Sequence, residues 1–149
     1  MAIQEGSPVN IVVDANVMVA ALIQHGIVRE LILGHPGAFL TPETCLTEVW
    51  ENRSDWNRRE VPDDQVRRAI DALTADFITV LPRSTYRDME TEASTLISDP
   101  DDVPVVALAL AIDNQGVWTF NTRDFLTPRL QTRIRVLGTT DVKGILSEP

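Results

Sequence analysis

The chain has 149 residues, which is enough for one domain with a sizeable core that needs neither disulfides nor a structural metal. Apolar residues make up 44% and charged residues 23% of the chain, an ordinary balance for a soluble globular protein. The net charge of −9 excludes broad electrostatic capture of nucleic acid, although a local basic rim remains compatible with it.

No apolar run approaches the roughly 20 residues that a membrane span needs, and residues 1–6 lack the basic-then-apolar pattern of a secretory signal. The single cysteine, Cys45, can form no internal disulfide, which fits a reducing compartment. We therefore expect a cytoplasmic protein that contacts no membrane. Neither His25 nor His35 has a recognisable motif around it, so Cys45 is a poor candidate for a catalytic nucleophile.

The first half of the chain alternates short apolar segments with helical patterns. After a leader over residues 1–8, the order predicted is a strand at about 9–13, a helix near 16–24, a short helix with Ile27, Leu31 and Ile32 on one face, a strand at 38–40 and a helix from Thr41 to about Asn52. Thr41 and Pro42 together are typical of an N-cap followed by proline in the first helical position.

The second half continues the alternation. It predicts a helix from Pro62, a strand at 77–81, a helix around 86–97, a strongly apolar helix from Val103 to about Asp113, a strand at 117–120, a loop at 121–125, a strand at 134–137 and a helix at 140–146. Such alternation predicts an α/β fold, with three layers (α/β/α) around a mostly parallel central sheet. We expect a single domain over residues 1–149, with its core at about 9–146.

Acidic residues recur where the predicted strands end. Asp14 lies at the end of the first strand, Glu48 lies on the edge of the apolar face of a helix, and Asp124 lies just beyond the strand at 117–120. Asp102 directly precedes the most apolar helix. Because the carboxyl ends of parallel strands lie at one edge of the sheet, these carboxylates are expected to converge.

Converging carboxylates repel one another, so a fold keeps them only where a cation lies among them. Oxygen ligands of this kind suit Mg²⁺ or Mn²⁺, and such an ion activates water and stabilises the leaving oxygen in phosphodiester hydrolysis. A capping role for Asp14 stays open, since Asp is a common N-cap, and Asn16 can bond either to the Asp14 side chain or to a free backbone group.

The acidic run before the apolar helix allows two interpretations. Asp99 followed by Pro100 is typical of an N-cap, and we interpret Asp99 as a cap. Asp101 is open between the two roles, whereas the apolar run that follows Asp102 favours a metal ligand there. The arginines are candidate RNA-backbone contacts, but pairing with neighbouring acids is the favoured interpretation for Arg53, Arg58, Arg59, Arg67, Arg68, Arg129, Arg133 and Arg135.

Four segments together resemble the PIN domain. These are IVVDANV over residues 11–17, Pro42 followed six residues later by Glu48, DVPVVALAL over 102–110 and WTFNTRDF over 118–125. The resemblance implies a three-layer α/β metal-dependent nuclease. Many small members of the family are VapC-type toxins, which cleave RNA, are neutralised by a small antitoxin and are commonly homodimers.

Carried over by motif, the resemblance makes Asp14, Glu48, Asp102 and Asp124 an acidic quartet that binds Mg²⁺ or Mn²⁺. Asn16 would lie beside the first aspartate, and Thr119 and Asn121 would shape the last loop. Family members often have Asp at the position of Asn121, which leaves the number of metals open.

Two other functions compete with this prediction. The first is a non-catalytic PIN module that binds RNA or a protein partner, for which converging carboxylates are not needed. The second is a phosphatase-like domain with Asp14 as nucleophile. That class needs a second aspartate where this chain has Asn16, and its lysine is also missing, because Lys143 lies near the end of the chain.

Overall fold

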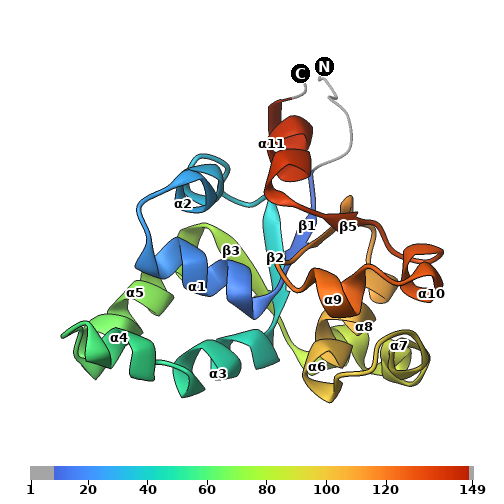
Figure 1. The fold of residues 1–149 in the computed structure, drawn as a ribbon, viewed down its shortest axis with the longest axis horizontal. Coiled ribbons are helices and arrows are strands. Elements are labelled where there is room, and N and C mark those ends of the chain that lie inside the picture. The colour runs from blue at the N-terminus through green and yellow to red at the C-terminus, as the bar shows by residue number, and fades with distance from the viewer. Residues whose placement is uncertain (1–8, 148–149) are drawn as a thin grey trace.

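The computed structural model describes residues 9–147, so the leader expected over residues 1–8 lies outside the described part. Its centre is a five-stranded sheet in the order β3-β2-β1-β4-β5, in which all neighbouring strands are parallel. The strands are β1 (Ile11–Val13), β2 (Phe39–Pro42), β3 (Ile78–Leu81), β4 (Gly116–Trp118) and β5 (Val136–Leu137). Helices flank this sheet (Figure 1), which confirms the predicted three-layer α/β fold.

The helices account for most of the remaining residues. They are α1 (Ala15–Ile23), α2 (Ile27–Leu33), α3 (Glu43–Glu51), α4 (Ser54–Arg58), α5 (Asp63–Asp76), α6 (Arg83–Tyr86), α7 (Glu90–Leu96), α8 (Val103–Ala111), α9 (Thr122–Phe125), α10 (Pro128–Gln131) and α11 (Thr139–Ser147), with 3₁₀ turns at Arg87–Met89 and Pro100–Asp102. Within residues 9–147 no single helix is long and apolar enough to cross a membrane, and only α1 and α2 taken together reach that length and composition, bent by 100°.

Continuous apolar runs explain the central elements. All three residues of β1 are fully buried, as expected for a parallel strand covered on both faces. Helix α8 is apolar around most of its circumference and packs against β1, β2 and β4. The residue just before α8, Asp102, is therefore held firmly at the edge of the core.

The predicted start of the helix after β2 was wrong. Thr41 and Pro42 belong to β2, where they pair with Val80 and Leu81 of β3, and α3 begins at Glu43. The Thr41 hydroxyl donates to the carbonyl of Val13 at 2.9 Å rather than capping the helix. Strand pairing, a long-range contact, extends β2 into residues whose local pattern favours a helix start.

Other differences also arise from packing. The helix predicted at 86–97 is divided into α6, a 3₁₀ turn and α7. The segment 121–125, predicted to be a loop, contains the short helix α9, and the short helices α4 and α10 were not predicted either. Ile27, predicted on the inner face of α2, is 44% exposed, whereas Leu31 and Ile32 are buried. Short amphipathic segments of four or five residues carry too few periods for a pattern to identify them.

Candidate acidic site

Asp14 and Thr119 lie side by side where β1 and β4 end. The strands are in register at Val13 and Trp118, and the Asp14 amide donates to the Trp118 carbonyl at 3.1 Å. Asp14 is 5% exposed; its Oδ2 accepts from the Thr119 hydroxyl at 2.8 Å, and its Oδ1 accepts from the amide of Ala15, also at 2.8 Å. The carboxylate therefore caps α1 and also contacts the loop after β4.

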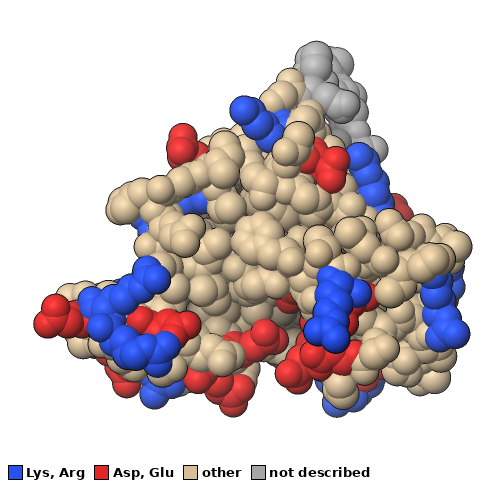
Figure 2. Space-filling view, viewed as in Figure 1, with Lys and Arg blue, Asp and Glu red and all other residues tan. Residues whose placement is uncertain are grey.

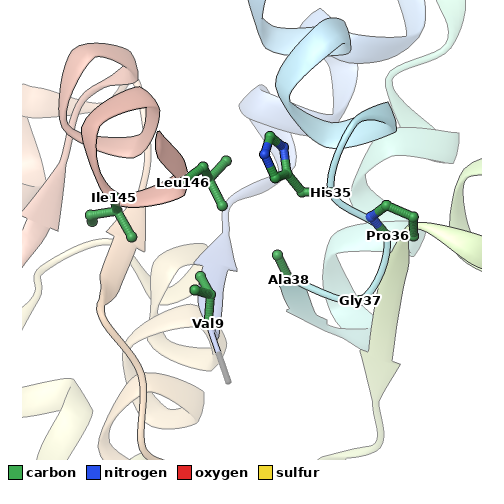
Figure 3. Close-up of a pocket in the computed structure, with 7 residues that line it drawn as sticks. All are labelled: Val9, His35, Pro36, Gly37, Ala38, Ile145 and Leu146. Atoms are coloured by element: carbon green, nitrogen blue, oxygen red, sulfur yellow. The ribbon is translucent and has the colours of Figure 1, made fainter. Parts of the chain in front are cut away.

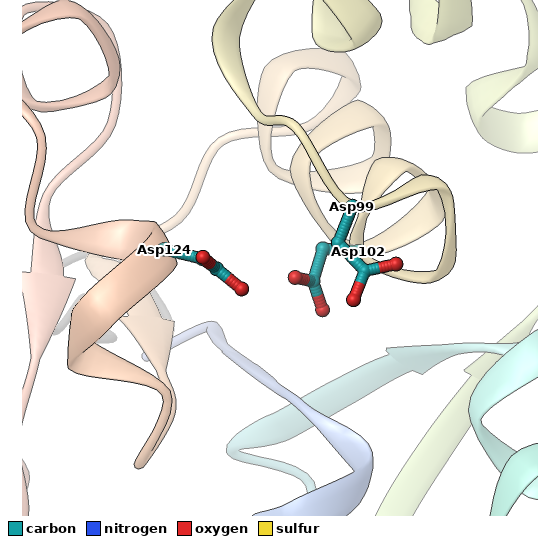
Figure 4. Close-up of side chains that lie close together, drawn as sticks. All are labelled: Asp99, Asp102 and Asp124. Atoms are coloured by element: carbon teal, nitrogen blue, oxygen red, sulfur yellow. The ribbon is translucent and has the colours of Figure 1, made fainter.

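Three further carboxylates meet beside this pair. Asp99 and Asp102 come from the turn before α8, and Asp124 comes from α9. Each contributes an oxygen, and these three oxygens all lie within 4.8 Å of one another. Figure 4 shows Asp124 pointing across the gap toward Asp99 and Asp102. We call Asp99, Asp102 and Asp124 the three-carboxylate group.

Asn121 holds two members of the three-carboxylate group together. Its Nδ2 donates to Oδ2 of Asp124 at 3.0 Å and to Oδ2 of Asp102 at 3.3 Å. Its Oδ1 accepts from the amide of Asp124 at 3.4 Å, so Asn121 is also the N-cap of α9. An aspartate at this position would be unable to donate these bonds, so the asparagine reduces the repulsion between Asp102 and Asp124.

The turn before α8 separates the roles of Asp99 and Asp101. Asp99 Oδ1 accepts from the amide of Asp101 at 3.0 Å, which confirms the predicted cap. Asp99 nevertheless belongs to the three-carboxylate group as well, because one capping bond does not use all the acceptor capacity of a carboxylate. Asp101 is exposed and lies outside the group. The sequence placed Asp99 in the acidic run at this edge, but its Asp-Pro motif favoured a cap alone.

Glu48 and Asn16 lie around the same edge. Glu48, half-buried on α3, lies outside the three-carboxylate group, but its pKa is raised to about 7, first by burial and then by the negative charges of Asp14, Asp101 and Asp99. Asn16 does bond to a backbone group, since its Oδ1 accepts from the amide of Phe120 at 3.3 Å. It thereby joins the start of α1 to the loop after β4.

The site carries uncompensated negative charge. Burial, followed by the charges of Asp14, Asp99, Asp124 and Glu48, raises the pKa of Asp102 to about 7. Burial also raises the pKa of Asp14, against the lowering effect of the Thr119 hydrogen bond. Among residues 9–147 no lysine or arginine forms an ion pair with any of these carboxylates. Oxygen-only donors with excess charge fit a hard divalent cation such as Mg²⁺ or Mn²⁺.

We expect this charge to appear in the pH dependence of the metal-free chain. The unfolded chain releases the Asp102 proton near pH 3.8, whereas the folded chain keeps it until about pH 7. Stability relative to Asp102→Asn should therefore fall as pH rises from 4 to 7, by on the order of 2 kcal/mol after allowance for solvent screening. Urea unfolding of the wild type and of Asp102→Asn, both in chelator, measures this difference in unfolding free energy at each pH. A difference that does not change with pH would contradict the prediction.

Elsewhere in the described residues we find no second group of reactive side chains comparable to the acidic site. Figure 2 shows acidic side chains along the lower edge of the view, over the region of α3, α6 and α9. A hollow of about 360 Å³ lies instead beside Val9, just before β1, between the turn after α2 and the end of α11 (Figure 3). Its one titratable residue, His35, hydrogen bonds to the carbonyl of Leu31. Cys45 is 2% exposed and burial raises its pKa to about 12, so its thiolate is inaccessible.

Most of the arginines are held by acids, rings or carbonyls. The favoured pairing with neighbouring acids is confirmed for three of them: Arg53 with Asp63, Arg58 with Asp55 and Arg68 with Asp64. Arg133 pairs instead with Glu92, which is distant in sequence. Arg67 and Arg53 also stack on Trp50, and Arg129 donates to the carbonyl of Thr95. Exposed ion pairs of this kind contribute little to stability. Because each pair is neutral overall, these arginines present little net positive charge to a polyanion such as RNA.

Comparison with known proteins identifies the family of the chain and agrees with its fold. A family model described as the PIN domain matches residues 12–138. The fold is similar to a toxin–antitoxin complex from Klebsiella pneumoniae (TM-score 0.62, 14% identity, 86% of this chain and 96% of that one) and to VapBC2 from Rickettsia felis bound to a promoter DNA fragment (0.58, 16%, 87% and 98%). No curated protein matches the chain in sequence. The family match covers most of the chain, which therefore belongs to the PIN domain family.

Proposed function

We propose that the chain is a metal-dependent endoribonuclease and the toxin of a toxin–antitoxin pair. The observation that carries the proposal is the convergence of Asp99, Asp102 and Asp124 beside Asp14, with no cation paired to them in the described residues. Membership of the PIN domain family supports nuclease chemistry at this edge. The similar structures include a toxin–antitoxin complex and a VapBC2 assembly, which supports the biological role.

Mg²⁺ or Mn²⁺ would be held by Asp14, Glu48, Asp102 and Asp124, and Asp99 would add one more oxygen; the oxygens of Asp99, Asp102 and Asp124 converge, and Asp14 and Glu48 lie near enough to raise the pKa of Asp102. When bound, such an ion supplies Lewis-acid activation of a phosphodiester and lowers the pKa of coordinated water. Thr119 orients Asp14 through its hydroxyl, and Asn121 holds the carboxylates of Asp102 and Asp124 next to each other by donating to both. These positions are set before substrate binds, because every orienting donor is part of the fold.

The role proposed for Glu48 is to position the ion or to orient the attacking water. In the metal-free chain, burial and the charges of Asp14, Asp101 and Asp99 raise the pKa of Glu48 to about 7, and a divalent cation bound at this edge would lower it again. The oxygen of the attacking water would form a bond to phosphorus as the bond from phosphorus to the leaving ribose oxygen breaks. The water would lose its proton to solvent, and the leaving oxygen would take one from solvent, so that one product ends in a phosphate and the other in a hydroxyl. The products are two shorter RNA strands, and no redox partner is needed.

The partners proposed for the chain are an RNA substrate, a small antitoxin and a second copy of the chain. A homodimer would bring two arginine-bearing edges together, although the net charge of −9 is carried by each copy. Antitoxin binding is proposed because the two similar structures described above are toxin–antitoxin assemblies.

Metal titration followed by thermal unfolding tests the proposal. In the wild type, Mn²⁺ or Mg²⁺ at about 100 times its dissociation constant should raise stability by about 2.7 kcal/mol, which is roughly 5–10 °C in melting temperature. The rise should be lost in Asp14→Asn and kept in Asp101→Asn, whose exposed side chain lies outside the three-carboxylate group. RNA cleavage is then measured with the same three chains, and only Asp14→Asn should lose activity.

The absence of any rise at millimolar metal in all three chains would contradict the metal site. The carboxylates would then act as caps only, and the chain would be a non-catalytic PIN module that binds RNA or a protein. Full cleavage by Asp14→Asn would equally overturn the assignment of Asp14.

A further inference from the structure

Phe120 is an exposed aromatic residue at the rim of the acidic site. It is 43% exposed, although Val117, Trp118 and Thr119 directly before it are 0–2% exposed. Single exposed apolar residues are common on protein surfaces, so exposure alone does not indicate a function. The position of Phe120 in the chain does. Phe120 lies between Thr119, which bonds to Asp14, and Asn121, which bonds to Asp102 and Asp124.

The backbone on both sides of Phe120 is held by hydrogen bonds. Its own amide donates to Asn16 Oδ1 at 3.3 Å, and the amide of Asn121 donates to the Thr119 hydroxyl at 3.0 Å. The aromatic ring is therefore attached to a segment whose place beside the carboxylates is set by the fold. A ring on a pre-positioned backbone costs little entropy when a flat partner binds it.

The charge of the molecule indicates which kind of contact can hold RNA here. With a net charge of −9 and a cluster of carboxylates at the site, the phosphate backbone is not broadly attracted. Stacking of a nucleobase on an aromatic ring does not depend on net charge, and it is available for every base. Arg123, exposed on the next turn, forms no hydrogen bond or ion pair in the described part of the chain, so it can contact the adjoining phosphate.

We propose that Phe120 is a base-stacking platform for single-stranded RNA, which holds the nucleotide next to the scissile phosphate. The proposal rests on the ribonuclease function proposed above. Unpaired RNA is required because the bases of a duplex already stack on one another and present no free face. Arg123, exposed three residues further along the chain, is the cation nearest in sequence that could contact the adjoining phosphate.

Steady-state cleavage of a short single-stranded RNA tests the stacking platform. Phe120→Ala should lower kcat/KM by about 5- to 150-fold, with the loss in KM, because stacking holds substrate and transition state alike. Phe120→Trp should keep activity, whereas Phe120→Leu, which is apolar but cannot stack, should behave like the alanine variant. Ile27→Ala is the matched control, since Ile27 is 44% exposed on α2 and lies outside the acidic site.

An abasic substrate separates stacking from a general structural effect. RNA lacking the base next to the cleaved bond should be a poor substrate for the wild type, and Phe120→Ala should lose nothing further on it. Unchanged KM in Phe120→Ala on intact RNA would overturn the proposal. So would a shift of Phe120→Ala from dimer to monomer with cleavage unchanged, which would assign the ring to a protein interface.

Failure of the proposed function has a different signature. If the wild type cleaves no RNA, equilibrium binding of the same fluorescent RNA still tests the platform. Weaker binding by Phe120→Ala and Phe120→Leu, but not by Phe120→Trp or Ile27→Ala, would support stacking without catalysis. Equal binding by all of these chains would overturn it.

Discussion

Replacement of Asp102 by Asn is expected to lower RNA cleavage about a thousandfold, because several kcal/mol of charge stabilisation by a bound ion are lost. Asp102 is 7% exposed and is one of the three carboxylates whose oxygens lie within 4.8 Å of one another. Its one side-chain hydrogen bond in the described chain, from Asn121, can also be accepted by an asparagine oxygen. Single-turnover cleavage at saturating Mn²⁺ measures the loss.

The same substitution should stabilise the metal-free protein. At pH 8 the wild type holds a buried charge among like charges, whereas Asn carries none. We expect the melting temperature of Asp102→Asn in chelator to exceed that of the wild type by roughly 3–6 °C, about 1–2 kcal/mol. Asp101→Asn is the control, with cleavage within a few-fold of the wild type. A variant that is inactive and also less stable would show that Asp102 is needed for folding rather than for binding an ion.

Replacement of Gly116 by Ala is expected to produce a large loss of stability. Gly116 begins β4 with φ of +145°, which L side chains rarely adopt. A Cβ there would lie 2.7 Å from the carbonyl oxygen of Arg135 and 2.8 Å from Cγ of Leu137, both on the neighbouring segment of β5. Backbone strain and overpacking together should cost about 4 kcal/mol, or roughly 8–16 °C in melting temperature.

Gly144→Ala provides the matched control. A Cβ at Gly144 meets nothing within 4 Å, and the residue lies inside α11, where alanine is the better helix former. Its melting temperature should equal or slightly exceed that of the wild type. If Gly116→Ala melted within a few degrees of Gly144→Ala, the close packing of β4 on β5 would not be essential to the sheet.

Local pattern accounted for most of the elements. The apolar runs around Val12, Leu40 and Val117 predicted buried strands, and the turns and helices between them predicted a parallel sheet. Errors occurred where distant pairing decides the boundary. Thr41 and Pro42 have the local signature of a helix start, but the register with β3 makes them the end of a strand.

The candidate site shows the same division. Parallel topology alone predicted that Asp14, Asp102 and Asp124 would come to one edge, because each follows a strand or opens a buried helix. The structure places Asp102 and Asp124 in one group and adds Asp99, which the Asp-Pro motif had explained as a cap. It also assigns Asn121 as the donor that joins Asp102 to Asp124.

The sequence by itself determined the five strands and the longer helices along the chain, the fold class and the edge at which the carboxylates gather. These follow from apolar periodicity and from the residue types at strand ends, which are local properties of the chain. Tertiary structure alone decided which oxygens meet, that Asn16 bonds to the amide of Phe120, and that Glu48 and Asp102 have pKa values raised to about 7. Those outcomes depend on distance and burial between residues far apart in the chain, and neither quantity is contained in a local pattern.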